Sequence, residues 1–546
     1  MDKISGPPDK LLLFLGVFAV YLYCAYPAFA PRDSADLALA ALNLGVAHPP
    51  GYPLYAVLGR AWLTLLPLGN PAYRLNLLSA AAGAAAAVCV YMIVQRRAGF
   101  WPALGAALAL AFSAPLWKFS LLNEMYSLHA LFVAWLVLLA QGDGTSPMRR
   151  ACLSALLFGL GLVNHQSLIL LLPALVFLWR AELIGLQINA SALLGRIMVF
   201  WFLGFALYAA VILRLRDFGL GWAVITRSEY GSFELFGGFS RQLNEPLALK
   251  LLGHLALGLI SGGSVLAAGL AGLGVWATCK QRSRFGMAML IGLGLFGPLF
   301  FLMTRFDLSN WVAQTVLETA FIIPTLFLCL LAGLGLKRLP QRAVTVAALA
   351  MGVSAFWLHG ALMNHRDDFS AYDYIRDLRS ALPPGSAAVV AGDTALFGLK
   401  YWEAWKRDAH APGVGRDSRL IVGARELDLR RWIEGQLGRR PVYVTGLSQV
   451  ALGQLGLWGK TQQVFPAGLA QRIGEKNETP ESAAWQMSVL RKSRSLENGE
   501  SYAHDIRLAY AFAHYLSAHL AADAVAAENH SREAAVLDPE DYRLAP

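Results

Sequence analysis

Charged residues are scarce in this sequence. Asp, Glu, Lys and Arg make up 15% of its 546 residues, whereas hydrophobic residues make up 56%. A soluble protein ordinarily carries about 25% charged residues. Several apolar runs are roughly 20 residues long, which is the length that a helix needs to cross the hydrocarbon core of a bilayer. These features exclude a soluble protein and predict an α-helical polytopic membrane protein.

Several common functional motifs are also missing. The sequence has no GxxxxGK(S/T) phosphate loop, no convincing GxGxxG after a strand, no HExxH pair and no CxxC pair. Their absence disfavours soluble nucleotide binding, zinc hydrolysis, thiol redox chemistry and an ATP-driven pump. The net charge is +10, but the basic residues form short pairs between apolar runs instead of one block. This distribution is typical of membrane topology signals and not of nucleic-acid binding.

Cysteine is rare as well. The chain has five cysteines, all within apolar runs or at their ends, and none lies beyond residue 364. The polar C-terminal part therefore has no cysteine for a structural disulfide. The five are expected to be small buried hydrophobic residues.

The apolar runs predict about eleven transmembrane helices. The first run is expected to be a retained span and not a cleaved signal peptide, because Pro31 directly follows an Ala-Phe-Ala that resembles a cleavage site. The runs lie near residues 11–30, 73–95, 101–119, 125–141, 151–164, 166–179, 196–213, 250–278, 285–303, 312–336 and 343–363.

Basic residues indicate how these helices are oriented. With the N-terminus in the cytoplasm, five successive connections that carry basic residues are also cytoplasmic, as the positive-inside rule requires. They contain Arg96-Arg97, Arg149-Arg150, Arg180 with Arg196, Lys280 to Arg284, and Lys337 to Arg342. An odd number of spans then places everything after residue 364 on the extracytoplasmic, periplasmic side of an inner or plasma membrane.

Composition divides the chain into two domains. Residues 1–363 form the predicted transmembrane domain, with an outer loop over 31–72 that contains an interfacial helix near 53–67. Residues 364–546 have the composition of a soluble domain. Short buried strands are expected at 387–391 and 441–444, with helices between them, which predicts a small α/β unit. The helical end, near 502–545, resembles one tetratricopeptide-type helix pair.

Two carboxylates follow the predicted first span. Ser34 is expected to cap a helix over residues 35–45, with Asp33 and Asp36 near its N-terminal end. Helix capping alone explains such a pattern. Charge at the mouth of a membrane bundle is costly and usually functional, however, and a carboxylate there can accept a proton from an attacking hydroxyl. Both interpretations stay open on these residues alone.

Three other polar blocks are predicted on the outer side. His48-Pro49-Pro50-Gly51-Tyr52 predicts a rigid turn that presents His48 and Tyr52, unless the turn is purely structural. Glu124, Ser127 and His129 open the fourth span and cannot all face lipid, although a glutamate that reaches the interface is the alternative. Asn164-His165-Gln166 interrupts an apolar stretch, which a helix-breaking turn explains almost as well.

Arginine is enriched where topology rules expect little of it. The predicted outer loop over residues 214–249 contains Arg214, Arg216, Arg227 and Arg241, and Arg305 lies in another outer turn. A guanidinium offers two parallel hydrogen bonds to phosphate oxygens, so a phosphate is the natural partner. Neutralisation of nearby acidic residues is the alternative for some of these arginines.

Taken in order, these motifs resemble the signature of the family-117 glycosyltransferases, a protein O-mannosyltransferase-like branch of the membrane GT-C superfamily. The matching segments are Asp33 to Leu37, Leu44 to Tyr55, Tyr73 to Ser79, Asn123 to His129, Asn164 to Gln166, Arg227 to Ser232, Leu382 to Ser386, and Gly392-Asp393. The block Ala-His-Pro-Pro-Gly-Tyr-Pro at residues 47–53 is the most specific. Where the family usually reads Asp-Ser-Gly-Glu, this chain has Ala35 and Asp36, and it has Glu318-Thr319 where Glu-Arg is frequent.

The resemblance implies a bundle of transmembrane helices with an outer soluble domain and a polyprenyl-phosphate-linked sugar donor. Asp33 matches the acid that acts as general base in the superfamily, with Asp36 beside it. The expected function is inverting transfer of a sugar to a hydroxyl of a protein, lipid or glycan on the extracytoplasmic face. The residues expected to bind the donor and its phosphate are His48, Tyr52, Glu124, His129, His165, Arg227 and Arg305.

Three further expectations complete this interpretation. No nucleotide is consumed at the site, whereas a divalent cation bound by Asp33, Asp36 and Glu124 stays open. The alternative function is a transporter or flippase of a lipid-linked substrate, which is disfavoured because no inverted repeat of broken helices is evident. A structural assembly factor that uses the terminal helices is a third possibility, and it predicts that the Asp33 region is dispensable.

Overall fold

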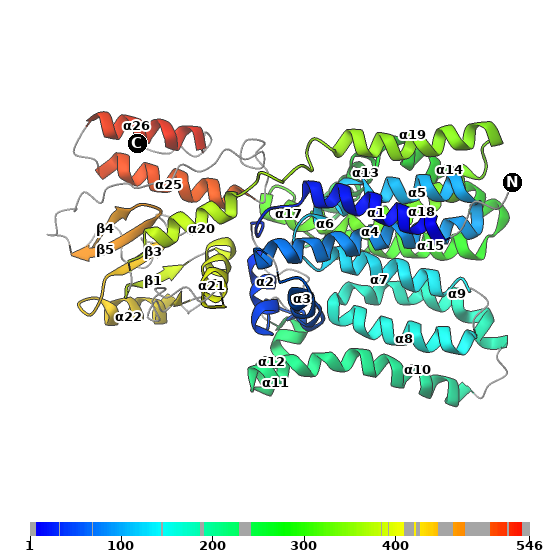
Figure 1. The fold of residues 1–546 in the computed structure, drawn as a ribbon, viewed down its shortest axis with the longest axis horizontal. Coiled ribbons are helices and arrows are strands. Elements are labelled where there is room, and N and C mark those ends of the chain that lie inside the picture. Colours follow the sequence, from blue (N-terminus) through cyan, green and yellow to red (C-terminus); the bar gives the residue numbers. More distant parts are fainter. Residues whose placement is uncertain are drawn as a thin grey trace. The chain divides into compact units, whose positions relative to one another are not determined.

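The computed structural model in Figure 1 describes most of the chain. The described residues are 7–31, 33–67, 69–142, 146–185, 190–228, 242–383, 385–390, 392–408, 420–421, 426–445, 462–475, 503–520 and 524–537. They form two compact units. Unit 1 comprises Met1–Tyr26 and Ala40–Arg366, and unit 2 comprises Pro27–Leu39 and Asp367–Pro546.

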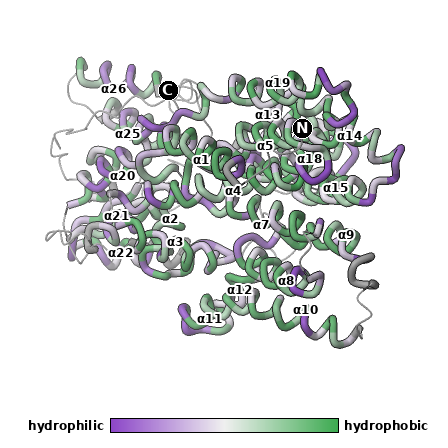
Figure 2. The backbone as a smooth tube through the Cα atoms, turned by 45° about the vertical axis from the view of Figure 1, so that its right-hand side comes forward, coloured by the Kyte–Doolittle hydropathy of each residue, from purple (hydrophilic) through white to green (hydrophobic). Residues whose placement is uncertain are grey.

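Unit 1 is helical, and most of its long helices run roughly along one direction (Figure 1). Hydrophobic residues predominate along these helices (Figure 2). Its first half contains α1 (Pro7–Cys24), α3 (Pro53–Leu65), α4 (Pro71–Ala98), α5 (Phe100–Ala111), α6 (Ala114–Ser120), α7 (Tyr126–Leu139), α8 (Pro147–Asn164), η1 (Gln166–Leu171) and α9 (Leu172–Gly185). Its second half contains α10 (Ala190–Phe205), η2 (Ala206–Tyr208), α11 (Ala209–Leu215), α12 (Phe218–Thr226), α13 (Glu245–Gly263), α14 (Val265–Gln281), α15 (Arg284–Gly294), η4 (Leu295–Leu299), α16 (Phe300–Thr304), α17 (Trp311–Ala320), α18 (Ile322–Leu336) and α19 (Gln341–His359).

Six helical segments in the described part of the chain are long and apolar enough to cross a membrane, or seven if the bent pair α5–α6 counts as one span. They are 71–98, 191–215, 245–263, 284–304, 313–336 and 341–359. Tyr126–Leu139 and Gln166–Arg180 are shorter apolar helices. A multi-pass membrane protein is therefore supported, whereas the predicted count of eleven spans is not confirmed.

Two predicted spans are interrupted in the structure. The run 250–278 is not one helix, because α13 ends at Gly263 and α14 begins at Val265. Gly262 and Gly263 weaken the helix at this point, and the Ser264 hydroxyl accepts a hydrogen bond from the amide of Ala267 and so caps the next one. The run 101–119 bends by 62° between α5 and α6, where Pro115 follows the first residue of the new helix.

Glycine allows two helix pairs of unit 1 to approach closely. A Cβ atom on Gly274 of α14 would lie 2.0 Å from the carbonyl oxygen of Leu331 in α18, and one on Gly335 would lie 2.0 Å from that of Leu270. Helices α8 and α10 meet in the same way through Gly159 and Gly204. Small residues at such crossings let backbones touch, which is how helices pack where lipid provides no hydrophobic driving force.

Unit 2 contains a mixed five-stranded sheet in the order β2-β1-β3-β5-β4. Strand β1 (Ala387–Val390) runs parallel to β2 (Leu420–Ile421) and to β3 (Val442–Thr445), and β5 (Ala470–Glu475) runs antiparallel to β3 and β4 (Gln462–Ala467). The helices are α20 (Ser370–Ser380), α21 (Asp393–Asp408), α22 (Glu426–Gln436), α25 (His504–Leu520) and α26 (Ala524–Leu537). The strands predicted near 387–391 and 441–444 correspond to β1 and β3, and the predicted terminal helix pair to α25 and α26.

A buried polar network attaches α25 to α20 within unit 2. The Arg376 guanidinium lies 3.0 Å from carboxylate oxygens of both Asp373 and Asp377, which are buried. The Tyr510 hydroxyl donates a hydrogen bond of 2.8 Å to the Asp377 carboxylate. The hydrogen bond from Tyr510 to a buried carboxylate therefore joins α25 to α20 within the unit.

The helix crossing at Gly274 can be tested by substitution. Gly274→Val would force atoms into the Leu331 carbonyl, and overpacking of this kind costs about 1–3 kcal/mol or more. We expect a lower melting temperature of the purified protein in detergent. Gly272→Val is the matched control, because that position on the same helix has no atom within 4 Å of a Cβ. Equal melting temperatures for the two variants would contradict the crossing.

Candidate functional site

The first carboxylate segment belongs to unit 2 and leads into helix α2 (Ser34–Asn43). Asp33 is half-buried and Asp36 is buried, with 5% of its surface exposed. The Asp33 carbonyl accepts a hydrogen bond from the amide of Leu37, so Asp33 is the N-cap residue of the helix that begins at Ser34. The Ser34 hydroxyl accepts from the amide of Ala30 at 3.1 Å, which differs from the predicted cap because Ser34 already lies in the first turn.

Packing holds this segment within unit 2. The ring of Phe29, four residues before Asp33, lies edge-on against Tyr401 of α21, with 5.3 Å between ring centroids. Both rings are buried. The carboxylates therefore follow a segment that is anchored in unit 2. The sequence had predicted a single domain over residues 1–363, which would include this segment.

The turn of His48 to Tyr52 belongs to unit 1. Its Gly51 amide donates to the His48 carbonyl at 2.8 Å, and the rings of His48 and Tyr52 meet edge to face at 5.0 Å. Gly51 has a φ of +93°, and a Cβ there would lie 3.2 Å from Val211 of α11 and 3.4 Å from Val224 of α12. The turn thus packs on the helices that lead to Arg227.

The polar residues that open α7 are buried. Glu124, Ser127 and His129 expose 2%, 0% and 3% of their surface, so none of them faces lipid. The Ser79 hydroxyl donates to the Glu124 carbonyl at 3.2 Å. Burial raises the pKa of the Tyr55 phenol in α3, a hydrogen bond with Ser79 lowers it, and the negative charge of Glu124 raises it by a smaller amount. Glu124 therefore contributes a carboxylate that acts on the interfacial helix predicted near 53–67.

A cluster of histidines forms around the break between α8 and η1. The rings of His129 and His165 lie 4.7 Å apart, and Tyr126 lies 5.5 Å from His165. The hydroxyl of Ser167 lies 2.7 Å from Nδ1 of His165 and 3.1 Å from Nε2 of His129. One serine therefore connects two of the three predicted site histidines.

Arg227 belongs to the same cluster. The side-chain amide of Gln166 donates to the carbonyl of Ile225 at 2.7 Å, which ties η1 to the end of α12, and Arg227 follows that helix with a φ of 56°. His165 lies between α8 and η1, outside the helices. Burial lowers the pKa of His165 to about 3, and the Arg227 guanidinium contributes to that shift. The cluster therefore holds a neutral His165 next to a cation.

Other predicted residues are not joined to this cluster. Arg305 is half-buried after α16, has a φ of 52° and makes no hydrogen bond or ion pair with any described residue. Glu318 forms an ion pair of 2.7 Å with Lys118. The next residue is Thr319, where the resembling family often has arginine. Arg241 lies outside the described residues.

The predicted carboxylates are divided between the units. Asp33 and Asp36 belong to unit 2 and Glu124 to unit 1. Within either unit, the described residues include no group of three His, Cys, Asp or Glu side chains that could hold a metal ion. The divalent cation stays a prediction.

Ser167 is the residue that the sequence prediction missed. It directly follows Asn164-His165-Gln166, and a hydroxyl just beyond a polar break was the available signal. Tyr126 and Gln166 lie inside predicted motifs but were not assigned to the site.

Comparison with known proteins adds to this geometry. Residues 33–182 match the family model of the protein O-mannosyl-transferase TMEM260 N-terminal domain. The protein O-mannosyl-transferase TMEM260 of Mus musculus is 28% identical over 428 residues, 72% of this chain and 60% of that protein. The protein O-mannosyl-transferase tmem260 of Dictyostelium discoideum is 24% identical over 444 residues, 70% of this chain and 54% of that protein. The chain thus spans little more than half the length of these relatives.

The fold also has a solved counterpart. The crystal structure of ArnT from Cupriavidus metallidurans bound to undecaprenyl phosphate superposes with a TM-score of 0.57, covering 86% of this chain and 98% of ArnT at 13% identity. The resemblance drawn from the sequence motifs is confirmed: this chain is similar in sequence to the TMEM260 protein O-mannosyl-transferases, and it shares its fold with ArnT, one of its GT-C glycosyltransferase neighbours.

Proposed function

We propose that this chain is a membrane glycosyltransferase that moves a sugar from a polyprenyl phosphate to an acceptor hydroxyl. The observation that carries the proposal is the cluster of His129, His165 and Arg227 at the break between α8 and η1. These residues come from three separate segments, and all three segments lie in motifs of the resembling family. The names of the curated relatives support a protein hydroxyl as the acceptor. A lipid or glycan acceptor is the alternative.

Arg227 is assigned to the donor phosphate. Its guanidinium offers two parallel donors to phosphate oxygens. ArnT, which shares this fold, was crystallised with undecaprenyl phosphate. Arg305 serves the same phosphate in this proposal, while His48, Tyr52 and Glu124 line the donor site. Fixed cations stabilise the charge that grows on the departing phosphate.

Asp33 is assigned as the general base. Its carboxylate accepts the proton of the acceptor hydroxyl, and the oxygen forms a bond to the anomeric carbon from the face opposite the phosphate. The bond between that carbon and the phosphate oxygen breaks, and the polyprenyl phosphate leaves with the electron pair. One displacement of this kind inverts the configuration at the anomeric carbon. Asp36, which is more buried than Asp33, positions the segment.

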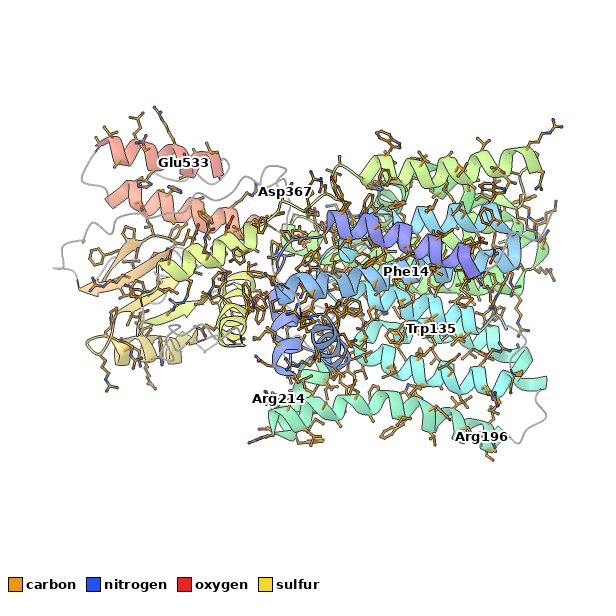
Figure 3. The ribbon with its side chains drawn as sticks, viewed as in Figure 1. Phe14, Trp135, Arg196, Arg214, Asp367 and Glu533 are labelled. Atoms are coloured by element: carbon orange, nitrogen blue, oxygen red, sulfur yellow. The ribbon has the colours of Figure 1, made fainter. Side chains whose placement is uncertain are left out.

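The reaction is assigned to the extracytoplasmic face. Figure 3 shows Arg196 near one end of the segment 191–215 and Arg214 near the other end. The basic clusters of the sequence orient the first of these ends to the cytoplasm. The N-terminus is then cytoplasmic, and unit 2 is periplasmic.

A reporter fusion tests this orientation. A periplasm-dependent reporter fused after residue 400 in unit 2 is expected to be active, because the predicted spans deliver that position to the outer side. The same reporter fused after Gln281, beside Lys280 and Arg282, is the control and is expected to be inactive. Activity of the second fusion with silence of the first would reverse the assigned orientation.

The phosphate assignment predicts unequal effects of arginine substitutions. Arg227→Ala removes a charged donor, and such hydrogen bonds contribute about 1.5–3 kcal/mol, so the KM for the donor should rise about tenfold or more. Arg305→Ala should act in the same direction. Arg180→Ala is the control, since Arg180 is exposed on α9 and assigned to the cytoplasmic side. The measurement is the KM for the donor with purified protein. If all three variants change it little and equally, the outer arginines only neutralise nearby acidic residues.

Asp33→Asn tests the base directly. The asparagine keeps the shape of the side chain but cannot accept the proton, and general-base catalysis typically contributes about 10²–10⁴-fold, so transfer should fall by that factor. The assay measures transfer of a hexose from its polyprenyl phosphate to a serine- and threonine-containing peptide. Asp217→Asn is the matched control, because Asp217 caps α12 through a 3.0 Å hydrogen bond that asparagine can also accept.

Other outcomes reassign the chemistry. Near-normal transfer by Asp33→Asn with an inactive Asp36→Asn variant would move the base to Asp36. Normal transfer by both variants would remove the first loop from the catalytic centre. A wild-type protein that moves the donor lipid across vesicles without transferring sugar would instead favour the transporter alternative.

A further inference from the structure

The single proton of the Ser167 hydroxyl constrains the two histidines that it joins. The oxygen lies 2.7 Å from Nδ1 of His165 and 3.1 Å from Nε2 of His129. A hydroxyl carries one hydrogen, so it can donate in only one of these contacts and must accept in the other. Two arrangements of the three groups satisfy this condition when both rings are neutral.

In the first arrangement, Ser167 donates to Nδ1 of His165 and accepts from an N–H at Nε2 of His129. His165 then carries its proton on Nε2, and Nδ1 of His129 is left as a bare lone pair. In the second arrangement, Ser167 donates to Nε2 of His129 and accepts from an N–H at Nδ1 of His165. His129 then carries its proton on Nδ1, and Nε2 of His165 is the bare acceptor.

The environment of His129 distinguishes between them. Nδ1 of His129 is buried and has no hydrogen-bond partner among the described residues. The second arrangement would leave an N–H at that atom without an acceptor, and orphaned buried N–H groups are rarer than acceptors with a spare lone pair. The first arrangement is therefore favoured.

The remaining nitrogen of His165 differs from that of His129. Nε2 of His165 has no hydrogen-bond partner among the described residues, yet it is not one of their buried unpaired atoms. His165 as a whole is half-buried, and Nε2 is its nitrogen that remains for a ligand. In the favoured arrangement the nitrogen carries a proton, and it offers a neutral donor in the cluster that contains Arg227.

We propose that Ser167 is a positioning residue, whose hydroxyl holds His165 in the Nε2–H tautomer so that His165 donates a hydrogen bond to an anionic oxygen of the donor lipid phosphate. The ligand class, a polyprenyl phosphate, rests on the proposed function. The tautomer does not, because it follows from the contacts of Ser167 and from the unpartnered Nδ1 of His129. A neutral donor next to the guanidinium binds an anion without adding a second buried charge.

Nitrogen-15 NMR of the full-length protein in detergent tests the tautomer without any activity assay. The two ring nitrogens of a neutral imidazole have distinct shifts, and the signals of His165 are those lost in His165→Asn. We expect Nε2 of His165 to be protonated in the wild type and in Ser167→Thr, which keeps the hydroxyl. In Ser167→Ala we expect a mixture of tautomers. Protonation of His165 at Nδ1 in the wild type, or an unchanged tautomer in Ser167→Ala, would overturn the proposal.

The ligand is tested with a short-chain polyprenyl phosphate as the probe. We expect it to shift the His165 signals of the wild type and to bind Ser167→Ala about tenfold more weakly, which is the loss expected for a hydrogen bond to a charged group. Ser167→Thr should restore binding. Ser261→Ala is the matched control, since that hydroxyl donates only to the carbonyl of Leu257 and should leave binding unchanged.

The two proposals fail in different ways. If the tautomer is as expected but the phosphate probe neither shifts the His165 signals nor binds more weakly to Ser167→Ala, the assignment of the ligand is wrong. The role of Ser167 in holding the His165 tautomer would then still stand. Binding that is weakened in Ser167→Ala but not restored in Ser167→Thr would indicate a packing role and would overturn the positioning role. Normal phosphate binding by a wild type that transfers no sugar would contradict the proposed function alone.

Discussion

The polar break between α8 and η1 is the feature on which the arrangement of the membrane unit's site depends. Four consecutive residues, 164–167, turn their side chains to other segments. Asn164 donates to the carbonyl of Met125 at 3.1 Å, His165 and Ser167 reach His129, and Gln166 reaches the carbonyl of Ile225. A continuous helix would point these side chains around its axis, whereas the break brings them to the start of α7 and the end of α12. Because unpaired polar groups are costly in lipid, these contacts also make the arrangement specific.

The sequence predicted the long helices of unit 1 but not all of the breaks between them. Long apolar runs predicted α4 and α18, because helix length in a membrane follows from the bilayer thickness. The run 250–278 was predicted as one span and is two helices. Hydropathy does not record the direction of the backbone, and Ser264 caps a new helix without interrupting the apolar composition. Period and composition therefore predict helices better than they predict breaks.

The same distinction holds for the site. His129 and His165 were predicted as functional because polar residues at the ends of apolar runs are costly, and Arg227 because topology rules expect little arginine in an outer loop. The structure brings the three into one cluster. Ser167 escaped notice because a serine in an apolar stretch is common and its role depends on distances to two rings from different helices. Asp33 was correctly placed after the first helix. Its membership of unit 2 depends on contacts such as Phe29 with Tyr401, which join residues far apart in the chain.

This division of the chain has a chemical consequence for the assigned reaction. The assigned base belongs to one compact unit, and the assigned phosphate cluster belongs to the other. The boundary between the units falls within helix α2, between Leu39 and Ala40. This helix therefore connects Asp33 to the turn at His48 along the chain. In the proposed reaction, proton acceptance and phosphate stabilisation therefore depend on different packing cores. A substitution that loosens the core of unit 2 should impair use of the acceptor more than binding of the lipid phosphate, and one that loosens the α8–η1 break should do the reverse. A division of the two assigned roles between two packing cores suits an enzyme with two substrates better than a transporter of one.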